Sequence, residues 1–361
     1  MSLPSHPEAI TPDWLNEQLS QRHPGAVVTA VEVLAVHAGT NANARLGLTY
    51  HGDPGLPATM FAKLPPLDPD RRAQINQTGM GRREALFYQR LAHRVPMETL
   101  TPYVAAFDDD TGAFVLLLED LENSAKSLPD PIAGVSVDYA ATAMDHFGEL
   151  HARYESADRR AAEADWVPPA NRGGSDYGAR LLRYGLDHHR DKLSDAFAEI
   201  SELYIHHTTA LHRLWVPGEI GGPATLLQGD GHIGNLFVTE SGGPGFLDWG
   251  LVNVGAPMRD VSYFLNMSLD PADRRRCDRD LIGRYLDART THGAQPISYD
   301  DAWLAHRIHA AYTVPASCQV VTFPDDASEG RRRFAAAFLA RAEAALADLD
   351  PLPLLRDALT P

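Results

Sequence analysis

One short stretch of the chain holds three polar side chains whose types and spacing suit phosphoryl transfer. Residues 228–248 read QGDGHIGNLFVTESGGPGFLD and contain Asp230, Asn235 and Asp248. A transferred phosphoryl group is highly charged and its transition state is loose, so a protein supplies mainly positioning and countercharge. One carboxylate can receive the proton of an attacking hydroxyl, and an amide and a second carboxylate offer the hard oxygen ligands that Mg²⁺ prefers. The stretch therefore predicts Asp230 as a catalytic base and Asn235 and Asp248 as metal ligands.

The spacing within this stretch strengthens that interpretation. Asp230 and Asn235 form a D-x-x-x-x-N pattern like that of protein kinase catalytic loops, and L-D-W-G at 247–250 stands where those enzymes have D-F-G. Each residue also has an ordinary structural alternative. Asp230 could be an exposed turn residue, Asn235 could be a turn or cap residue, and Asp248 could form an Asx turn. These alternatives do not explain why Asn235 and Asp248 flank one predicted hairpin, with strands at 236–238 and 245–247.

Three further residues are predicted to support the Asp230 loop. Gln228 stands directly before Gly-Asp, and His232 follows Asp230 by two residues. His232 could order the loop or contact phosphate, and its alternative is a packed, hydrogen-bonded histidine. Asp260 begins an apolar helical pattern, where we expect a cap or an anchor for the loop rather than a metal ligand. No second ligand lies at zinc spacing from His232.

Lys63 and Glu84 are candidates for an ion pair that binds phosphate. Lys63 ends a predicted strand, and Glu84 lies in the next predicted helix, twenty-one residues later. In a kinase-type site, a lysine held by a carboxylate points at the α- and β-phosphates. The alternative is a surface lysine and a solvated helix face. We favour the pair because its strand and helix precede the Asp-Asn-Asp group in the order that a kinase-type site needs.

A short polar loop could cover the phosphates of a nucleotide. The segment AGTNAN at 38–43 offers the backbone N–H groups of Gly39, Thr40 and Asn41 and the Thr40 hydroxyl as donors. Its sequence is neither G-x-G-x-x-G nor a Walker motif, and an ordinary hairpin loop is the alternative.

Periodicity predicts two lobes of different composition. Strands are expected at 27–36, 45–50, 59–64 and 113–118, with one amphipathic helix at 82–91 and a short helix that starts at Thr11-Pro12. Downstream, helical patterns dominate, at 136–155, 176–213, 257–290, 299–318 and 329–349. We therefore expect an α+β fold with a nucleotide-binding lobe at 1–118 and a larger, mostly helical catalytic and substrate-binding lobe at 119–361.

Composition narrows the classes of partner. The chain has 361 residues and a formal net charge of −16, which argues against nucleic acid and anionic membranes as partners. The acidic surface could favour a cationic substrate, or it could serve solubility alone. Two cysteines form no disulfide framework, and the N-terminus shows no signal peptide pattern. We expect a cytoplasmic protein, and the sequence does not predict its oligomeric state.

These motifs together resemble the aminoglycoside phosphotransferase and choline kinase-like group, the phosphotransferase enzyme family. The carriers of the resemblance are QGDGHIGN, FLDWG and PMRDVSYFL, with Lys63, REALFY and VLLLEDL upstream. EALFY and LLLEDL are most similar to the ecdysteroid kinase-like and actinobacterial branches. The resemblance implies a bilobal protein kinase-like fold that uses ATP (or GTP) and Mg²⁺, with Glu119 and Leu121 near the adenine. This sequence departs from the family pattern at Gln228, where the family has His, and in its glycine-poor phosphate loop.

The sequence thus supports two main hypotheses. The first is an ATP- and magnesium-dependent enzyme that transfers the γ-phosphate to a hydroxyl of a small molecule. The second is a pseudokinase-like module that binds nucleotide or metabolite without turnover, motivated by Gln228 and the phosphate loop. A hydrolase has no supporting G-x-S-x-G elbow. Several aromatic residues on predicted helices could line an acceptor pocket or belong to the core: Trp166, Tyr177, Tyr184, Trp303 and Tyr312.

Overall fold

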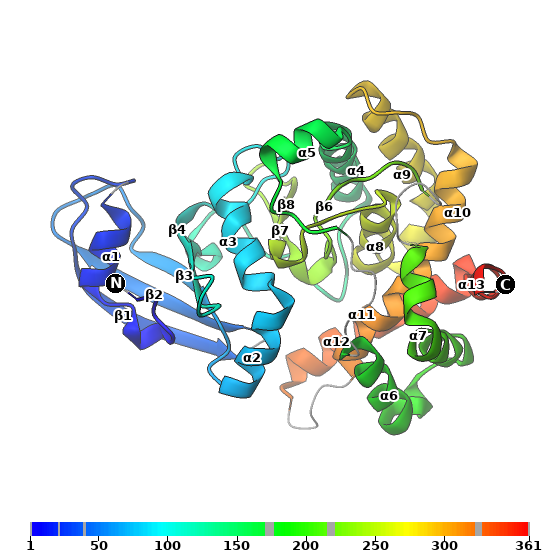
Figure 1. Cartoon of the computed structure of the whole chain (residues 1–361), viewed down its shortest axis with the longest axis horizontal. Helices are drawn as coiled ribbons and strands as arrows, with labels where there is room; N and C mark the ends of the chain where they lie inside the picture. The colour runs from blue at the N-terminus through cyan, green and yellow to red at the C-terminus, as the bar shows by residue number, and fades with distance from the viewer. Residues whose placement is uncertain are drawn as a thin grey trace. The chain divides into compact units, whose positions relative to one another are not determined.

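The computed structural model describes residues 2–20, 22–38, 41–169, 177–214, 221–321 and 327–359. The chain divides into two compact units (Figure 1). The N-terminal unit comprises Met1–Leu128, Phe237–Ser241 and Gly245–Val252, and the C-terminal unit comprises Pro129–Leu236, Gly242–Pro244 and Asn253–Pro361. The hairpin that precedes Asp248 therefore belongs mainly to the N-terminal unit, although it lies late in the sequence.

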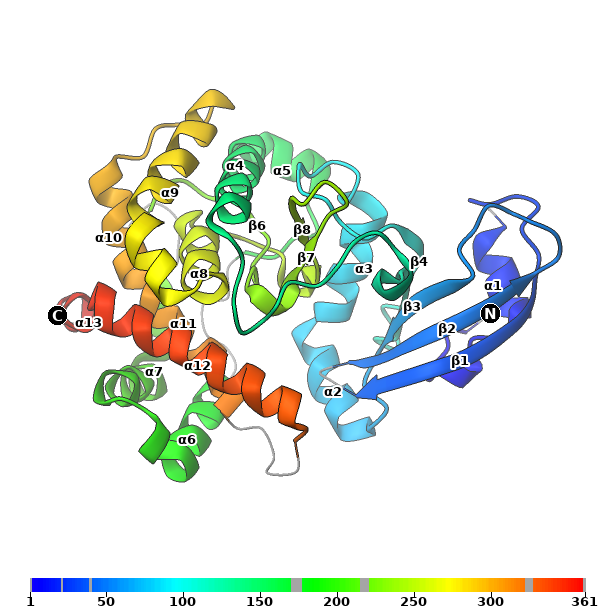
Figure 2. The same ribbon diagram turned by 180° about the vertical axis from the view of Figure 1, so that it is seen from behind.

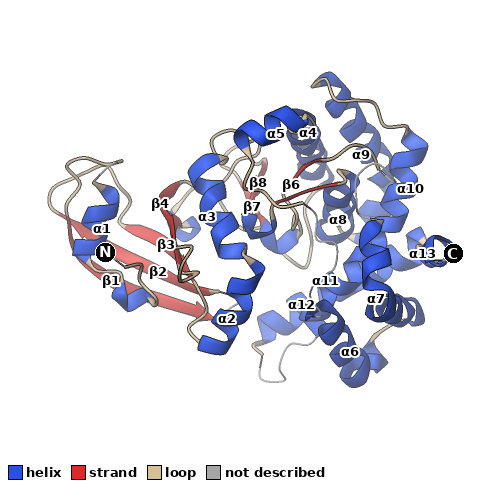
Figure 3. Cartoon of the chain, in the orientation of Figure 1, coloured by secondary structure: helices blue, strands red, loops and turns tan. Residues whose placement is uncertain are grey.

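A five-stranded antiparallel sheet forms the body of the N-terminal unit (Figure 3). The strands lie in the order β1-β2-β3-β5-β4. Their bounds are β1 Val28–Ala38, β2 Ala42–Tyr50, β3 Thr59–Leu64, β4 Pro102–Phe107 and β5 Phe114–Glu119. The register places Lys63 between Asn43 on one side and Leu116 on the other. Lys63 thus lies at the end of a strand that is hydrogen-bonded along both edges.

Alternation of apolar residues explains which face of this sheet is buried. On β2, Ala44, Leu46 and Leu48 alternate with more exposed neighbours, as a half-buried strand requires. These residues pack in one core with Trp14 and Leu15 of α1 (Pro12–Leu19). The predicted helix start is confirmed, because Thr11 is the N-cap and its side chain accepts a hydrogen bond from Trp14 N.

Two consecutive helices follow β3. They are α2 (Pro69–Thr78) and α3 (Met80–Arg90), which packs against β4 and β5. Gly79 separates them with φ of 68°, a left-handed conformation that suits glycine. On α3, Gly81 sits against the ring of Phe114, where a Cβ atom would lie 2.1 Å from a ring carbon. This close approach lets α3 lie directly on the sheet and carry Glu84 toward β3.

The C-terminal unit is mostly helical (Figure 2). Its helices are α4 Val137–Arg153, α5 Ala157–Glu163, α6 Tyr177–His189, α7 Asp195–Arg213, α8 Met258–Ser268, α9 Pro271–Thr291, α10 Tyr299–His309, α11 Thr313–Val321, α12 Glu329–Leu349 and α13 Leu352–Leu359. A short antiparallel pair, β6 (Thr225–Leu227) and β9 (Asn253–Gly255), runs among them. The loop that carries Asp230 follows β6 directly.

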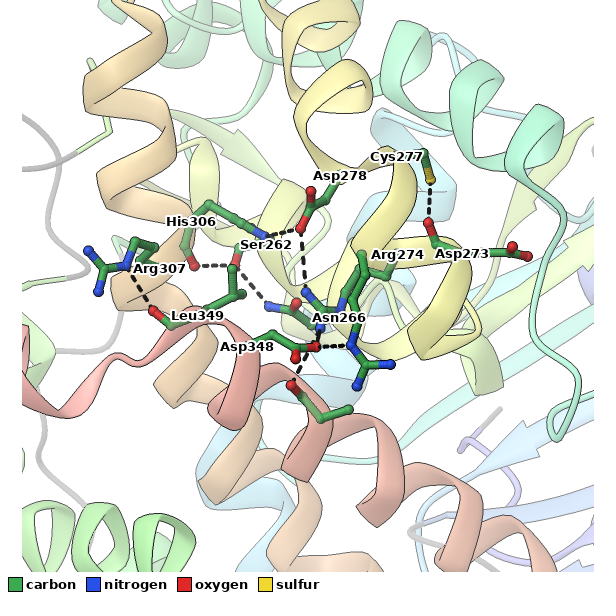
Figure 4. Close-up of polar contacts among 12 residues, drawn as sticks. Ser262, Asn266, Asp273, Arg274, Cys277, Asp278, His306, Arg307, Asp348 and Leu349 are labelled. Atoms are coloured by element: carbon green, nitrogen blue, oxygen red, sulfur yellow. Dashed lines mark hydrogen bonds and ion pairs between the residues drawn. The ribbon is translucent and has the colours of Figure 1, made fainter.

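Buried polar contacts tie together the helices around α8 (Figure 4). The Arg274 guanidinium on α9 is buried and forms ion pairs with Asp278 and with Asp348 of α12. Ser262 of α8 donates a hydrogen bond to the carbonyl oxygen of His306 on α10, at 3.1 Å. Arg274 thus joins α9 to α12 and Ser262 joins α8 to α10, and α8 in turn supplies side chains to the Asp230 loop.

The expected fold class is confirmed, and several details of the prediction were wrong. Three predicted helical segments are each broken in two: 176–213 between α6 and α7, 257–290 between α8 and α9, and 299–318 between α10 and α11. At the second break, Asp270 caps α9 and Pro271 occupies its first turn, so the chain restarts rather than continues. Helix α2 and strand β4 were missed. The first has no buried face, and the second is an edge strand with weak alternation.

Within the described part of the chain, no helix combines the length and the apolar character needed to cross a bilayer.

Two helical glycines should respond oppositely to the same substitution. Gly148 of α4 lies against α9, where an added Cβ would come within 2.5 Å of the Ala288 Cβ, whereas Gly283 of α9 has open space. We expect Gly148→Ala to destabilise the protein by about 1–3 kcal/mol through overpacking. Gly283→Ala should stabilise it by about 0.5–1 kcal/mol through helix propensity. Thermal denaturation measures both, and a Gly148→Ala variant as stable as the wild type would contradict the packing of α4 on α9.

Stability should depend on pH through His306. Burial, reinforced by the Arg274 charge, lowers the pKa of His306 to about 3, below its ordinary value near 6.5. A group with a lowered folded-state pKa contributes stability above about pH 6.5, and this is lost as the pH falls toward 3. At pH 5 the loss should be about 2 kcal/mol. Denaturant titrations at pH 7.5 and 5 should show a smaller loss for His306→Phe, and equal losses would contradict the buried, neutral histidine.

Candidate active site

A buried lysine and two carboxylates form one group of candidate site residues. The Lys63 Nζ atom lies 2.6 Å from Oε2 of Glu84 and 3.1 Å from Oδ1 of Asp248. The Lys63 and Glu84 side chains are 9% and 3% exposed, while Asp248 is 35% exposed. All three belong to the N-terminal unit. The structure therefore brings together the predicted pair and one predicted metal ligand, and Asp248 is the most exposed of the three.

The charges of this group support one another. Burial lowers the pKa of Lys63, but the negative charges of Asp248 and Glu84 outweigh it and hold that pKa above the ordinary value. Burial acts on Glu84 in the opposite sense and raises the pKa of its carboxyl, against the stabilising effect of Lys63. Lys63 therefore stays protonated, as a countercharge for phosphate must.

Helix α3 positions Asp248 as well as Glu84. Asp248 has φ of 49°, so it turns the chain sharply after β8 (Pro244–Phe246). The next residue, Trp249, is buried and stacks on Phe87 of α3 with ring centroids 3.9 Å apart. Arg83 of α3 donates a hydrogen bond from Nε to the Gly250 carbonyl oxygen at 2.7 Å. One helix thus sets both carboxylates that flank Lys63.

The predicted nucleotide-binding residues at the ends of the sheet are described in part. Gly39 and Thr40 lie outside the described residues. Asn41 is buried, and its Oδ1 atom has no hydrogen-bond partner among the described residues. Glu119 ends β5, and its carboxylate accepts a hydrogen bond from Lys126 Nζ at 2.9 Å. Leu121 follows in a single 3₁₀ turn, partly exposed.

The Asp230 loop carries a second group of candidate residues, in the C-terminal unit. The Asp230 backbone N–H donates to the side-chain oxygen of Gln228 at 2.6 Å. The Asn235 side-chain amide donates to Oδ2 of Asp230 at 2.9 Å and to its carbonyl oxygen at 3.0 Å. Because the amide nitrogen is used in this way, the Asn235 side-chain oxygen remains as a ligand for a cation. The loop thus aligns the predicted base and one predicted metal ligand.

Asp260 anchors this loop from below. Its two carboxylate oxygens accept hydrogen bonds from Gln228 N at 2.7 Å and Gly229 N at 2.9 Å. Asp260 is 1% exposed, and His151 of α4 lies 3.5 Å away. Burial lowers the pKa of His151, although Asp260 opposes the shift. A charge-assisted contact to two successive backbone amides fixes the turn before Asp230.

His232 folds back onto its own loop. Its Nδ1 atom accepts a hydrogen bond from Gly234 N at 3.0 Å, and its Nε2 atom lies 3.7 Å from Oδ2 of Asp230. The ring makes edge contacts with Tyr263 and Phe338. These contacts are those that the loop-ordering interpretation of His232 requires.

Comparison with known proteins identifies the family. A family model for the phosphotransferase enzyme family matches residues 49–297. The chain belongs to the phosphotransferase enzyme family. This membership makes the chain a phosphotransferase, an enzyme of the small-molecule kinase class. No curated protein sequence matched the chain.

Solved structures of kinases share the fold of this phosphotransferase. A choline kinase from Cryptosporidium parvum has a TM-score of 0.54 at 11% identity, covering 97% of each chain. A putative aminoglycoside phosphotransferase from Ralstonia eutropha has a TM-score of 0.50 at 16% identity, covering 94% of this chain and 98% of the other. A spectinomycin phosphotransferase, solved with ADP and spectinomycin, has a TM-score of 0.50 at 14% identity, covering 93% and 99%. At these identities the likeness shows the protein kinase-like fold.

Tyr263 is a site residue of this phosphotransferase that the sequence analysis missed. Its hydroxyl hydrogen-bonds to the Asp230 carboxylate, and burial, with the Asp230 charge, raises the pKa of Tyr263 well above its ordinary value. The phenol therefore stays neutral and donates to the carboxylate. A signal existed, because Tyr263 lies three residues after Asp260 on a helix and so shares its face.

Of the aromatic residues considered for an acceptor pocket, Tyr312 contacts Tyr263, which hydrogen-bonds to the Asp230 carboxylate. Its ring centroid is 5.1 Å from that of Tyr263. Trp303 instead packs under the Arg279 guanidinium, and Tyr184 stacks on His188. Trp166 is partly buried, and the side chain of Tyr177 is outside the described part.

Asp260→Asn should test the anchor of the Asp230 loop. In the wild type, the backbone N–H groups of Gln228 and Gly229 each donate to an Asp260 oxygen. In the variant, the side-chain amide keeps one oxygen, and its NH₂ group faces one of these N–H groups, so two donors oppose each other. We expect a loss of about 2–4 kcal/mol in the free energy of unfolding. Asp287, exposed on α9, offers the matched control. Asp287→Asn should change stability by less than about 0.5 kcal/mol, and similar losses in both variants would contradict the anchor.

Proposed function

We propose that this phosphotransferase moves the γ-phosphate of ATP to a hydroxyl of a small molecule and that it requires Mg²⁺. The observation that carries the proposal is the Asp230 loop. Its carboxylate is 22% exposed, oriented by Asn235 and hydrogen-bonded by Tyr263. A fixed, accessible carboxylate beside an amide ligand suits a base that meets a hydroxyl.

The residues present fit a nucleotide with its metal ion. No group of three or more His, Cys, Asp or Glu side chains able to bind metal occurs among the described residues. A divalent ion held by only two protein oxygens is characteristic of Mg²⁺, which keeps water and phosphate oxygens as its other ligands. Asn235 and Asp248 would supply these two oxygens. When bound, Mg²⁺ would neutralise charge on the phosphates.

Proton transfer to Asp230 accompanies the displacement. The acceptor oxygen forms a bond to the γ-phosphorus as the bond from that phosphorus to the β–γ bridging oxygen breaks. The bridging oxygen keeps the electron pair and leaves on ADP, and the hydroxyl proton passes to the Asp230 carboxylate. Tyr263 and the Asn235 amide donate to this carboxylate, so they hold it in place before transfer.

Lys63 supplies countercharge to the α- and β-phosphates in this proposal. A protonated ammonium at the end of a central strand is rigid, because Glu84 holds it at 2.6 Å and the strand is paired on both edges. Asn41 adds an amide at the end of the neighbouring strand, and Gly39, Thr40, Glu119 and Leu121 complete the proposed nucleotide contacts. In the same proposal, the lobe at residues 1–118 binds the nucleotide and the lobe at residues 119–361 binds the acceptor. The reaction takes place in the cytoplasm.

Two substitutions should separate chemistry from nucleotide binding. Asp230→Asn removes the proton acceptor and should lower turnover by about 10²- to 10⁴-fold, while magnesium-dependent ADP binding persists. Asp248→Asn should weaken magnesium-dependent ADP binding itself, because it removes the anionic ligand. Calorimetric titration with ADP and a phosphorylation assay with ATP against alcohols, amino alcohols and aminoglycosides measure the two effects.

The pseudokinase hypothesis predicts a different pattern in the same assays. Magnesium-dependent nucleotide binding without transfer to any acceptor in the panel would favour it. Equal turnover in the wild type and in Asp230→Asn would refute the role of Asp230 as the base.

A further inference from the structure

A half-buried arginine lies close to the proposed base and has no carboxylate partner. Arg259 is the second residue of α8, next to Asp260. Among the described residues, no Asp or Glu lies within ion-pair distance of its guanidinium, and its Nε atom is buried without a hydrogen-bond partner. Asp260 itself uses both oxygens on the amides of Gln228 and Gly229. A partly buried cation without an anionic partner is unfavourable, and a bound anion would stabilise it.

Aromatic rings connect Arg259 to Asp230. The guanidinium lies over the ring of Tyr312, 4.2 Å from its centroid. The Tyr312 and Tyr263 rings meet edge to face at 5.1 Å, and the Tyr263 hydroxyl contacts the Asp230 carboxylate. All four residues belong to the C-terminal unit. Tyr263 and Tyr312 thus form a continuous line of contacts from Asp230 to Arg259.

The charge of Arg259 persists in this environment. Burial lowers the pKa of Arg259, but Tyr312 and the Asp260 charge outweigh it, so the guanidinium stays protonated. The neighbouring His309 adds no competing charge, because burial, with Arg259, lowers its pKa to about 3. The tyrosines nearby offer hydroxyl groups and rings but no negative charge. The Asp260 charge acts on Arg259 only from nearby, because both Asp260 oxygens are used by backbone amides, and among the described residues no carboxylate forms an ion pair with the guanidinium.

We propose that the acceptor carries an anionic oxygen group, a carboxylate or a phosphate, which Arg259 binds while Asp230 meets the hydroxyl. The inference rests on the proposed phosphotransfer and specifies the substrate class of that site. Without Arg259, an anion beside the Asp230 carboxylate would be repelled. A planar guanidinium offers paired donors that match the two oxygens of a carboxylate or phosphate.

The rings around the loop add an apolar requirement. Tyr312 and Phe334 are partly exposed, and Phe334 packs on Phe338, which contacts His232. Such partly exposed rings bind apolar or aromatic carbon skeletons. The acceptor class is therefore a hydroxy acid or a phosphorylated alcohol with an apolar body, rather than an amino alcohol.

Matched acceptors test this specificity in turnover. The panel pairs aromatic hydroxy acids with their methyl esters and adds phosphate monoesters of aromatic diols and aromatic amino alcohols, with ATP and Mg²⁺. We expect the wild type to favour the acid over its ester in kcat/KM. Arg259→Gln should reduce that ratio about 10- to 100-fold, the size of a lost charged hydrogen bond. Arg259→Lys should restore part of the ratio, because it keeps the charge.

A surface arginine provides the control. Arg276 of α9 is 68% exposed and pairs only with Asp273 of its own helix among the described residues. Arg276→Gln should leave the ratio of acid to ester unchanged. Circular dichroism and thermal denaturation check that the Arg259 variants fold. If Arg259→Gln lowers kcat/KM for acid and ester equally, the residue is structural and the inference fails.

Binding without turnover separates this inference from the proposed function. Calorimetry measures the affinity of each acceptor for the protein with Mg²⁺ and ADP. Acid binding that depends on Arg259, without phosphorylation, would support the anion site and overturn the phosphotransfer. If only neutral or cationic acceptors are phosphorylated, the result supports the phosphotransfer and overturns the anion site. If no acceptor binds and none is phosphorylated, both are overturned. If the affinity for carboxylate acceptors exceeds that for phosphate acceptors, the site binds a carboxylate. The opposite order identifies a phosphate.

Discussion

The hydrogen bonds of one buried carboxylate hold the catalytic loop in place. Asp260 receives two successive backbone N–H groups, at Gln228 and Gly229, directly before Asp230. A buried carboxylate is costly to desolvate, and charge-assisted hydrogen bonds offset that cost only when their geometry is good. These hydrogen bonds therefore restrict the conformations that the loop can adopt. Gln228, Asp230 and Asn235 then complete the turn with their own hydrogen bonds.

The same carboxylate connects the loop to the helical core. His151 of α4 lies beside Asp260 and hydrogen-bonds to Tyr285 of α9 at 2.8 Å. Helix α8 brings Asp260, Tyr263 and Arg259 to the loop within little more than one turn. In Figure 4, Ser262 joins α8 to α10, and His306 of α10 lies 3.9 Å from Asp278 of α9, so the position of the Asp230 loop depends on the packing of this core.

In the N-terminal unit, a buried cation is neutralised by carboxylates, whereas at the Asp230 loop a buried carboxylate is stabilised by backbone N–H groups. A single buried ammonium, Lys63, lies between two carboxylates of unequal exposure. The inner one, Glu84, is enclosed and fixes the lysine. The outer one, Asp248, is 35% exposed and is the residue proposed to meet the metal ion. Phosphate and Mg²⁺ would add charges of both signs, so the group can accept them without an unpaired buried charge.

The sequence by itself determined the residue types and their order along the chain. Hard oxygen ligands at kinase-like spacing predicted the roles proposed for Asp230, Asn235 and Asp248, and apolar periodicity predicted strands such as 59–64, which the structure confirms. Local pattern did not predict α2 or β4, because α2 is polar on all sides and β4 is a weakly alternating edge strand.

Only the tertiary structure decided which side chains meet. The 2.6 Å contact of Lys63 with Glu84 joins a strand to a helix. The bond of Tyr263 to Asp230 and the ring contact of Arg259 with Tyr312 join residues from separate elements. Such contacts depend on how α8 packs against the 3₁₀ turn Ala310–Tyr312 and the loop after β6, which spacing along one chain does not specify. The physical reason is that periodicity reports which face of an element is buried, whereas long-range packing selects its partner.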